Sequence, residues 1–420
     1  MSAVTTDRST SQAVTAGVVT ALVGFTSSFA VVLTGLTAVG ASQGQAASGL
    51  AVVSLTMGLG CIVLSLAHRT PVTIAWSTPG AALLAGATLP SAGWAGAVGA
   101  FVVAGVLYLL TAVVKPLGDW VARIPSAIAS AMLAGVLLTL CVAPFRALAA
   151  DPASIAPVLV TWLVLLRWAR RWAVPGALLA AVVVIAVAGE PLDQGSLLPA
   201  LTWTMPELDW RTMLALGIPL YLVTMTGQNI PGVAVLESFG YRAPLRSALT
   251  WAGLTTVLTA PAGGFSTNLA AISAALAAGP EAGPDRARRW IAGVTCGVVY
   301  LLLAPLSVLV TSISAAAPDG IIASVAGLAL IGTFAAATTS ALSDARHREA
   351  GAVTFLVAAS GLTFAGISPA FWALVAGGVV FGVLRGRVRP SPCSAPEGQR
   401  APRRHTSSAR RARPRGWRCR

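Results

Sequence analysis

Long apolar stretches follow one another along almost the whole chain, and they restrict what it can fold into. They recur between positions 15 and 384, separated only by short segments that contain Arg, Gly or Pro. A stretch of about 20 apolar residues can cross a hydrocarbon core of about 30 Å as a helix. Of the 420 residues, 56% are hydrophobic and only 10% are charged, which is too few to cover a water-exposed surface. The sequence therefore predicts an all-α polytopic membrane protein.

Breaks at charged residues and at Pro/Gly clusters divide these stretches into fourteen predicted spans. The spans are 15–40, 46–66, 72–89, 94–114, 125–145, 153–169, 173–189, 212–236, 245–262, 263–279, 288–312, 319–342, 350–367 and 369–385. The predicted organisation is an N-terminal segment 1–12, a first seven-span repeat 13–190, a second seven-span repeat 205–386 and a basic tail 387–420. The first span is too long for the apolar region of a signal peptide, so it is predicted to be a retained helix.

Basic residues are unevenly distributed among the connections between spans. If the N-terminus is cytoplasmic, most of the arginines fall after even-numbered spans, and acidic residues dominate on the other side. Cytoplasmic connections carry an excess of Lys and Arg, so both termini are predicted to be cytoplasmic. Twelve arginines between Arg385 and Arg420 account for much of the net charge of +14. This tail is predicted to be disordered and to enforce topology or touch anionic lipid rather than nucleic acid.

The cysteines and histidines show no spacing typical of metal ligands. The five cysteines are scattered over apolar stretches and the tail, and the three histidines lie between spans or in the tail. The sequence therefore predicts neither a metal site nor a cofactor.

The third and tenth predicted spans share a pattern that interrupts a helix in mid-span. In the third, a β-branched run at 72–74 leads into WSTPG at 76–80, where Ser or Thr can cap a helix and proline suits its first turn. In the tenth, a Gly/Pro-rich entry at 260–264 leads into FSTN at 265–268, whose polar residues are expected to cap an Ala-rich helix. Each span predicts a short extended segment followed by a half-helix that begins near the bilayer centre.

The two interrupted spans occupy the same place in their repeats, and because seven is odd the repeats would be inverted. Paired interruptions in inverted repeats point to a transporter binding site near the midplane. Two half-helix N-termini present N–H groups and positive dipole ends, which suit a carboxylate. Trp76 and Phe265 flank the two helix starts and can offer faces to an aromatic ring. The alternative is that both interruptions are kinks without a ligand.

Polar residues also interrupt the eighth and first predicted spans. Gln228 and Asn229 are costly to bury unpaired in lipid, so they are expected to face protein, water or ligand, with helix–helix hydrogen bonding as the alternative. In the first span, Ser27 and Ser28 are interpreted as small residues for helix packing.

No Asp, Glu, Lys or Arg lies clearly at mid-membrane depth in any predicted span. The nearest acids are Glu237, Glu281 and Asp285, which are candidates for proton coupling. Salt bridges with Arg242 and Arg286 are the alternative role for them. A proton can also enter bound to a weak-acid substrate, which needs no titrating side chain.

Four segments contain longer sequence patterns: RTPVTIAWSTPGAALLAG from Arg69, IPLYLVTMTGQNIPGVAVLESFGYRAP from Ile218, APAGGFSTNLAAISAALAAGPEAGPDRARR from Ala260 and VTFLVAASGLTFAGISPAFWALVAG from Val353. Together they resemble the benzoate:proton symporter (BenE-type) family of bacterial inner membranes. The resemblance covers about 13–385. It implies secondary transport of benzoate or a related aromatic carboxylate by proton symport. A permease for another small organic anion or a nucleobase is the alternative, and an intramembrane enzyme would need a catalytic cluster that the spans lack.

The resemblance also implies a fold similar to uracil/xanthine permeases and sulfate-type anion transporters. That fold has seven-plus-seven inverted repeats, a core domain with the site at spans three and ten, and a gate domain that often forms homodimers. Those distant relatives carry acidic residues near the site on spans eight and ten, where this chain has Gln228, Asn229 and Asn268. The replacement favours an anionic substrate and leaves the proton route open. The substrate-binding residues implied by position are Trp76, Ser77, Thr78, Gly80, Gln228, Asn229, Phe265, Ser266, Thr267 and Asn268.

Overall fold

The computed structural model describes residues 2–114, 125–189, 199–364 and 369–385. The basic tail predicted at 387–420 lies outside them. The longer helices are α1 (Ser2–Thr26), α2 (Phe29–Ala38), α3 (Gln43–His68), α4 (Thr78–Ala85), α5 (Gly93–Val113), α7 (Ser126–Ala150), α8 (Pro152–Trp168), α9 (Ala173–Ala188), α11 (Ile218–Thr224), α12 (Ile230–Ser238), α13 (Leu245–Thr259), α14 (Ile272–Ala278), α15 (Trp290–Leu303), α16 (Ser307–Ala315), α17 (Ile321–Ser343), α18 (Arg348–Ala359) and α19 (Pro369–Arg385). The described residues also contain a helical turn, α10 (Trp210–Thr212), several short 3-10 and π-helical segments, and two strands, β1 (Ile74–Trp76) and β2 (Thr267–Leu269).

The helices follow the predicted spans closely. Within the described residues, eight helices are long and apolar enough to cross a membrane, and each coincides with a predicted span. The remaining predicted spans coincide with shorter elements, among them the interrupted spans three and ten. Helix α1 begins at Ser2, so it includes most of the predicted N-terminal segment 1–12. The first predicted span is interrupted where its polar residues lie, because α1 ends at Thr26 and α2 begins at Phe29.

The start of the eighth span shows why a helix begins where it does. The carboxylate of Asp209 accepts hydrogen bonds from the backbone amides of Arg211 and Thr212, at 3.3 and 3.1 Å, which caps α10. The hydroxyl of Thr212 also donates to this carboxylate and is the main reason that the pKa of Asp209 is lowered from its ordinary value. A capped start just before the apolar stretch fixes where the span enters.

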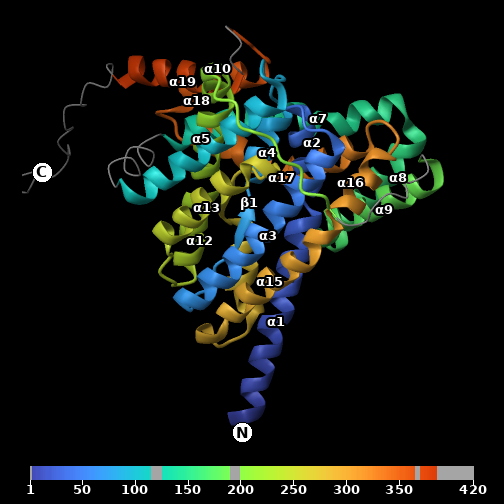
Figure 1. The fold of residues 1–420 in the computed structure, drawn as a ribbon, viewed down its shortest axis with the longest axis vertical. Helices are drawn as coiled ribbons and strands as arrows, with labels where there is room; N and C mark the ends of the chain where they lie inside the picture. Colours follow the sequence, from blue (N-terminus) through green and yellow to red (C-terminus); the bar gives the residue numbers. More distant parts are fainter. Residues whose placement is uncertain (1, 115–124, 190–198, 365–368, 386–420) are drawn as a thin grey trace, which may run out of the picture. The chain divides into compact units, whose positions relative to one another are not determined.

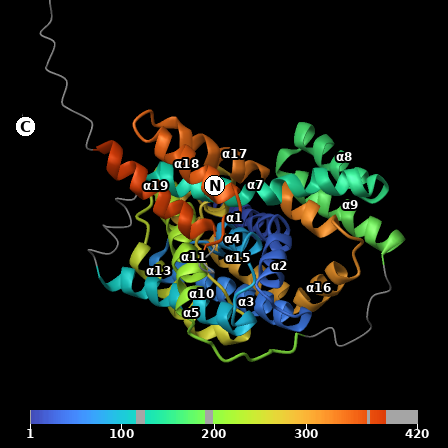
Figure 2. The same cartoon turned by 90° about the horizontal axis from the view of Figure 1, so that it is seen from above.

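Packing within the unit that ends at Phe381 crosses between the predicted repeats. Helix α3 packs against α15, and α13 packs against α5. The second span therefore contacts the eleventh, and the ninth contacts the fourth. A two-fold axis between inverted repeats relates these two contacts to each other. In a second group, α7 packs against α17 and α18, and α8 packs against α9 (Figure 1). Seen from above, α8 and α9 lie on the opposite side from α5 and α13 (Figure 2). Of the unit Gly382–Arg420, the structure describes only the end of α19.

A two-stranded ribbon lies inside this packing and joins the two interrupted spans. Strands β1 and β2 are antiparallel, with Ile74 opposite Leu269 and Trp76 opposite Thr267. In Figure 1 the ribbon lies between α3 and α13, which contact β1 and β2 respectively. Backbone that is neither helix nor barrel is tolerated at membrane depth only where protein or a water-filled cavity surrounds it. The ribbon therefore marks the place where a site can form.

Candidate functional site

The third span confirms the predicted half-helix. After β1, Ser77 adopts an extended conformation and its hydroxyl accepts a hydrogen bond from the backbone amide of Gly80 at 3.0 Å. Pro79 occupies the first turn, where it lacks only an amide that would have no helical partner. Gly80 is also required by space, because a Cβ there would lie 2.5 Å from Cδ1 of Leu220. Helix α4 therefore begins at Thr78, with its N-terminal end beside the ribbon.

The tenth span is also interrupted, but the expected caps are wrong. Thr267 and Asn268 lie in strand β2, and α14 begins only at Ile272, without a side-chain cap of its own. Antiparallel pairing commits this segment to β1, so the backbone of Ser266 accepts a hydrogen bond from the amide of Ser77 at 2.9 Å. The half-helix therefore begins later than its polar residues suggest.

Span eight supplies the polar groups that the tenth span lacks. Residues Met225–Asn229 form a π-helical segment, which is an insertion often found at functional sites. The side-chain oxygen of Asn229 accepts a hydrogen bond from the amide of Leu269 at 3.0 Å, and that of Gln228 accepts one from Ala271 at 3.2 Å. The side chains of Asn229 and Gln228 thus hold the outer edge of β2 and the residue before α14. Their partners are backbone groups outside the helices rather than a neighbouring helix, as helix–helix hydrogen bonding would require.

A buried arginine holds the other end of α14. Arg289 is only 7% exposed, and its guanidinium donates to the carbonyl of Ala278, the last residue of α14, at 2.7 Å. It also donates to the carbonyl of Gly283 at 2.8 Å. A cation at a helix C-terminus is favoured by the helix dipole, and bonds from charged donors are the stronger ones.

Replacing this arginine is expected to loosen α14. Arg289→Met keeps the apolar stem but leaves two carbonyls without their donor, so the melting temperature of the purified protein should fall by about 2–4 °C. Thermal unfolding in detergent, followed by size-exclusion fluorescence, measures this shift. Arg288→Met is the matched control, because the side chain of Arg288 is 41% exposed. Equal shifts in the two variants would contradict a special role for Arg289.

The break in the first span faces the same place. The indole N–H of Trp76 donates to the hydroxyl of Ser28 at 2.8 Å, which ties the end of β1 to the interruption between α1 and α2. The Trp76 ring also packs against Phe25, with ring centroids 5.3 Å apart. The interpretation of Ser27 and Ser28 as simple packing residues is therefore wrong, since a helix break with a hydroxyl acceptor faces the ribbon.

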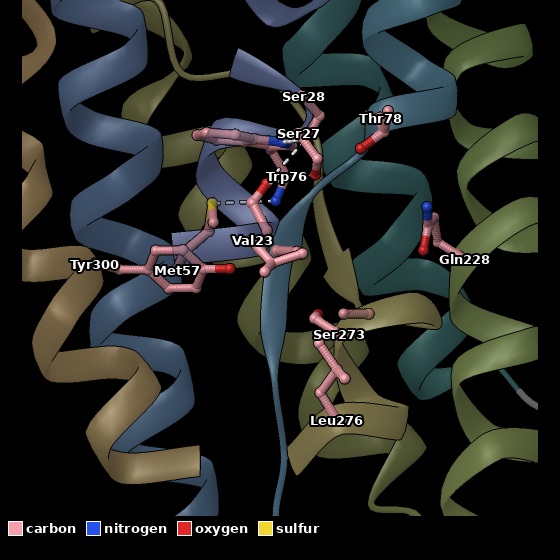
Figure 3. A pocket seen from close by; sticks show the side chains of 13 residues that line it. Val23, Ser27, Ser28, Met57, Trp76, Thr78, Gln228, Ser273, Leu276 and Tyr300 are labelled. Atoms are coloured by element: carbon pink, nitrogen blue, oxygen red, sulfur yellow. Dashed lines mark hydrogen bonds between the residues drawn. The ribbon is translucent and has the colours of Figure 1, made fainter. Parts of the chain in front are cut away.

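A cavity opens where these interrupted elements meet. Its volume is about 70 Å³, which is smaller than that of most small-molecule sites. The lining residues are Val23, Gly24, Ser27, Ser28, Met57, Ala75, Trp76, Thr78, Gln228, Ala270, Ser273, Leu276 and Tyr300. Figure 3 shows Trp76, Met57 and Tyr300 on one side of this view and Gln228 on the other. None of the described lining residues is charged, so the cavity offers hydroxyls, an amide and ring faces.

Four buried hydroxyl groups that do not line the cavity form a chain of hydrogen bonds. The hydroxyls of Tyr108 and Ser266 are 2.5 Å apart, and Ser266 donates to Thr224 at 3.4 Å. Thr224 shares a hydrogen bond of 2.6 Å with Ser77, the cap of α4. All four residues are fully buried, so the chain satisfies groups that would otherwise be costly and links both interrupted spans to spans four and eight.

Only some of the residues predicted from the sequence reach the cavity. Trp76, Thr78 and Gln228 line it. The others are not among its lining residues. Ser77 and Gly80 form the cap of α4, and Asn229 accepts a hydrogen bond from β2. Phe265 packs against Phe101, Ser266 belongs to the hydroxyl chain, Thr267 is hydrogen-bonded to Thr255, and the side-chain amide of Asn268 donates to the Leu269 carbonyl. The structure thus places Phe265 in the core rather than beside a ligand.

The acids considered for proton coupling lie away from the cavity. Glu237, Glu281 and Asp285 are exposed, and none of them lines it. Asp285 caps the turn at Ala287 and lies 3.5 Å from Arg288. Their placement favours the alternative interpretation as surface residues, although Asp285 pairs with Arg288 rather than with Arg286.

Several lining residues were not predicted. Tyr300 lies on α15 and Met57 on α3, inside apolar spans that carry no local signal for a site. Ser273 is the second residue of α14, beyond the FSTN motif at 265–268 that indicated a site in this span. Only the Ser27–Ser28 pair carried a signal, since adjacent serines in mid-span can interrupt a helix.

The chain resembles known proteins over most of its length. The sequence profile of a family described as benzoate membrane transport protein matches residues 7–383. The inner membrane protein YdcO of Escherichia coli (strain K12) is 37% identical over 375 residues, which cover 88% of this chain and 95% of that protein. The benzoate membrane transport protein of Acinetobacter baylyi (strain ATCC 33305 / BD413 / ADP1) is 31% identical over 336 residues, covering 79% of this chain and 84% of that protein.

Solved structures share the fold. The transmembrane domain of the cyanobacterium bicarbonate transporter BicA matches with a TM-score of 0.57 at 17% identity, covering 88% of this chain and 96% of that chain. The structure of SLC26A9 matches with a TM-score of 0.58 at 13% identity, covering 90% of this chain and 66% of that chain. At such identities the likeness establishes the fold alone. Together with the family match, it shows that this chain is a multi-pass membrane transporter that belongs to the benzoate membrane transport protein (BenE) family.

Proposed function

We propose that this protein carries benzoate, or a closely related aromatic carboxylate, across the bacterial inner membrane. The observation that carries the proposal is the uncharged cavity at the ribbon, lined by the rings of Trp76 and Tyr300 and by the hydroxyl of Thr78 at the start of α4. The ring faces suit an aromatic body. A helix N-terminus and hydroxyls suit a carboxylate without a buried cation.

Proton symport is the mode of coupling that we propose. None of the described lining residues is a carboxylic acid or a basic residue, so the substrate is proposed to bind as the carboxylate and to take up the proton itself, without a titrating side chain. Protonation of the bound substrate before it crosses avoids the cost of moving a charge through an apolar site. Both termini are proposed to be cytoplasmic, as the arginine distribution favours. A homodimer is proposed by resemblance to the family.

Uptake of labelled benzoate into proteoliposomes tests the proposal directly. An inward proton gradient is expected to drive accumulation above the outside concentration, and excess unlabelled benzoate should abolish it. Protein-free liposomes under the same gradient are the essential control, because benzoic acid itself crosses lipid. Accumulation that equals this control would contradict the proposal. Uptake of labelled uracil that unlabelled benzoate does not inhibit would favour the nucleobase alternative.

A further inference from the structure

The outer edge of strand β1 is held by side chains of a helix rather than by another strand. In an antiparallel ribbon, each strand pairs along one edge and leaves alternate N–H and C=O groups unpaired along the other. For β1 the outer groups belong to Val72, Ile74 and Trp76, because Thr73 and Ser77 bond to the β2 segment. At membrane depth these groups have no water and must find partners in the protein.

Three residues of α3 provide these partners in matching order. The sulfur of Met57 accepts a hydrogen bond from the amide of Trp76 at 3.1 Å. The thiol of Cys61 accepts from the Ile74 amide at 3.0 Å and donates to the Ile74 carbonyl at 3.3 Å. The next contact in this order is a donation from Ser65 to the carbonyl of Val72, at 3.0 Å.

The spacing explains why this ladder fits. Residues 57, 61 and 65 recur every four positions on α3, which advances about 6 Å for each step. Residues 76, 74 and 72 recur every two positions on an extended segment, which advances about 6.6 Å for each step. One helical face can therefore follow one strand edge, and Cys61 contacts both polar groups of Ile74 as a neighbouring strand would.

We propose that Met57, Cys61 and Ser65 are positioning residues that fix β1 and thereby place the Trp76 ring in the cavity. The inference rests on the proposed function for its link to benzoate. Sulfur is a weak hydrogen-bond acceptor, so two of the three rungs are softer than the amide bonds by which Gln228 and Asn229 hold the β2 side. Cys61 is the cleanest probe, because it is fully buried and does not line the cavity, whereas Met57 does.

The test compares Cys61→Ala with Cys61→Ser and with a control, Cys141→Ala. The control also removes the thiol of a buried cysteine, but in α7 rather than α3. Cys61→Ala leaves the Ile74 amide without an acceptor and should raise the KM for benzoate about tenfold, with little change in kcat. Cys61→Ser retains a donor and acceptor and should stay within about threefold of the wild type. The melting temperature of Cys61→Ala should lie about 2–4 °C below that of Cys141→Ala, because only Cys61→Ala leaves a buried backbone amide unpaired, and Cys61→Ser should restore it.

Hydrogen exchange measured by mass spectrometry tests the ladder independently of transport. Amides in the peptide that spans 72–77 should exchange about tenfold faster in Cys61→Ala than in Cys141→Ala, and Cys61→Ser should restore their protection. Unchanged exchange in Cys61→Ala would overturn the ladder. Faster exchange with an unchanged KM would overturn the positioning role, and faster exchange in a protein that does not carry benzoate would overturn only the proposed substrate.

Discussion

Gln228→Glu is expected to raise the KM for benzoate about 100-fold. Glutamate has nearly the same shape, and its oxygen can still accept the hydrogen bond from the amide of Ala271, so the entry of α14 should be preserved. What changes is the charge on a cavity wall. Two like charges about 4 Å apart repel by about 4 kcal/mol at an effective dielectric constant of 20, and every 1.4 kcal/mol is a factor of ten. The full repulsion would raise the KM more than 100-fold, and partial protonation of the new carboxyl reduces the expected rise to about 100-fold.

Concentration-dependent uptake in proteoliposomes measures this change. Gln43→Glu introduces the same charge at an exposed position in the first turn of α3, and its KM should stay within about twofold of the wild type. A neutral substrate would not be repelled, so an unchanged KM in Gln228→Glu would count against an anion at this wall. That outcome would favour binding of benzoate as the neutral acid.

Much of the fold could be predicted from the sequence because the bilayer imposes a strong rule. Apolar length and the breaks between stretches predict helices, and the described helices follow them. The WSTPG motif at 76–80 also identified the start of α4, since a Ser cap and an early proline act through neighbouring residues only. Local chemistry of this kind can be read from one segment.

The rest of the site depends on partners distant in sequence. The FSTN motif at 265–268 resembles a cap, but pairing with β1 draws it into a strand, and Gln228 bonds the amide at the entry of α14 instead. Tyr300 and Met57 line the cavity only because α15 and α3 pack beside the ribbon. No local pattern predicts such contacts, which explains why Phe265 was expected at the ligand and lies in the core.

Trp76 should show the largest effect among single substitutions of the lining residues. Its ring is 2% exposed, lines the cavity, packs against Phe25 and donates to Ser28. Trp76→Ala removes all of these contacts, and uptake of benzoate should fall at least about 100-fold in kcat/KM. Truncating a buried tryptophan also costs about 3–5 kcal/mol of stability, so the yield and melting temperature of this variant must be measured with its uptake.

Selectivity separates the loss of an aromatic contact from a loss of folding. Trp76→Phe keeps a ring face but lacks the donor to Ser28, and its KM should rise only about tenfold. Trp76→Leu keeps apolar volume without a ring, so the preference for benzoate over cyclohexanecarboxylate should fall about 2- to 10-fold, because ring–ring contacts contribute about 0.5–1.5 kcal/mol. Trp94→Phe, at a buried tryptophan of α5 that does not line the cavity, should retain the wild-type preference. An equal preference in Trp76→Leu and the wild type would show that the ring of the substrate does not rest on Trp76.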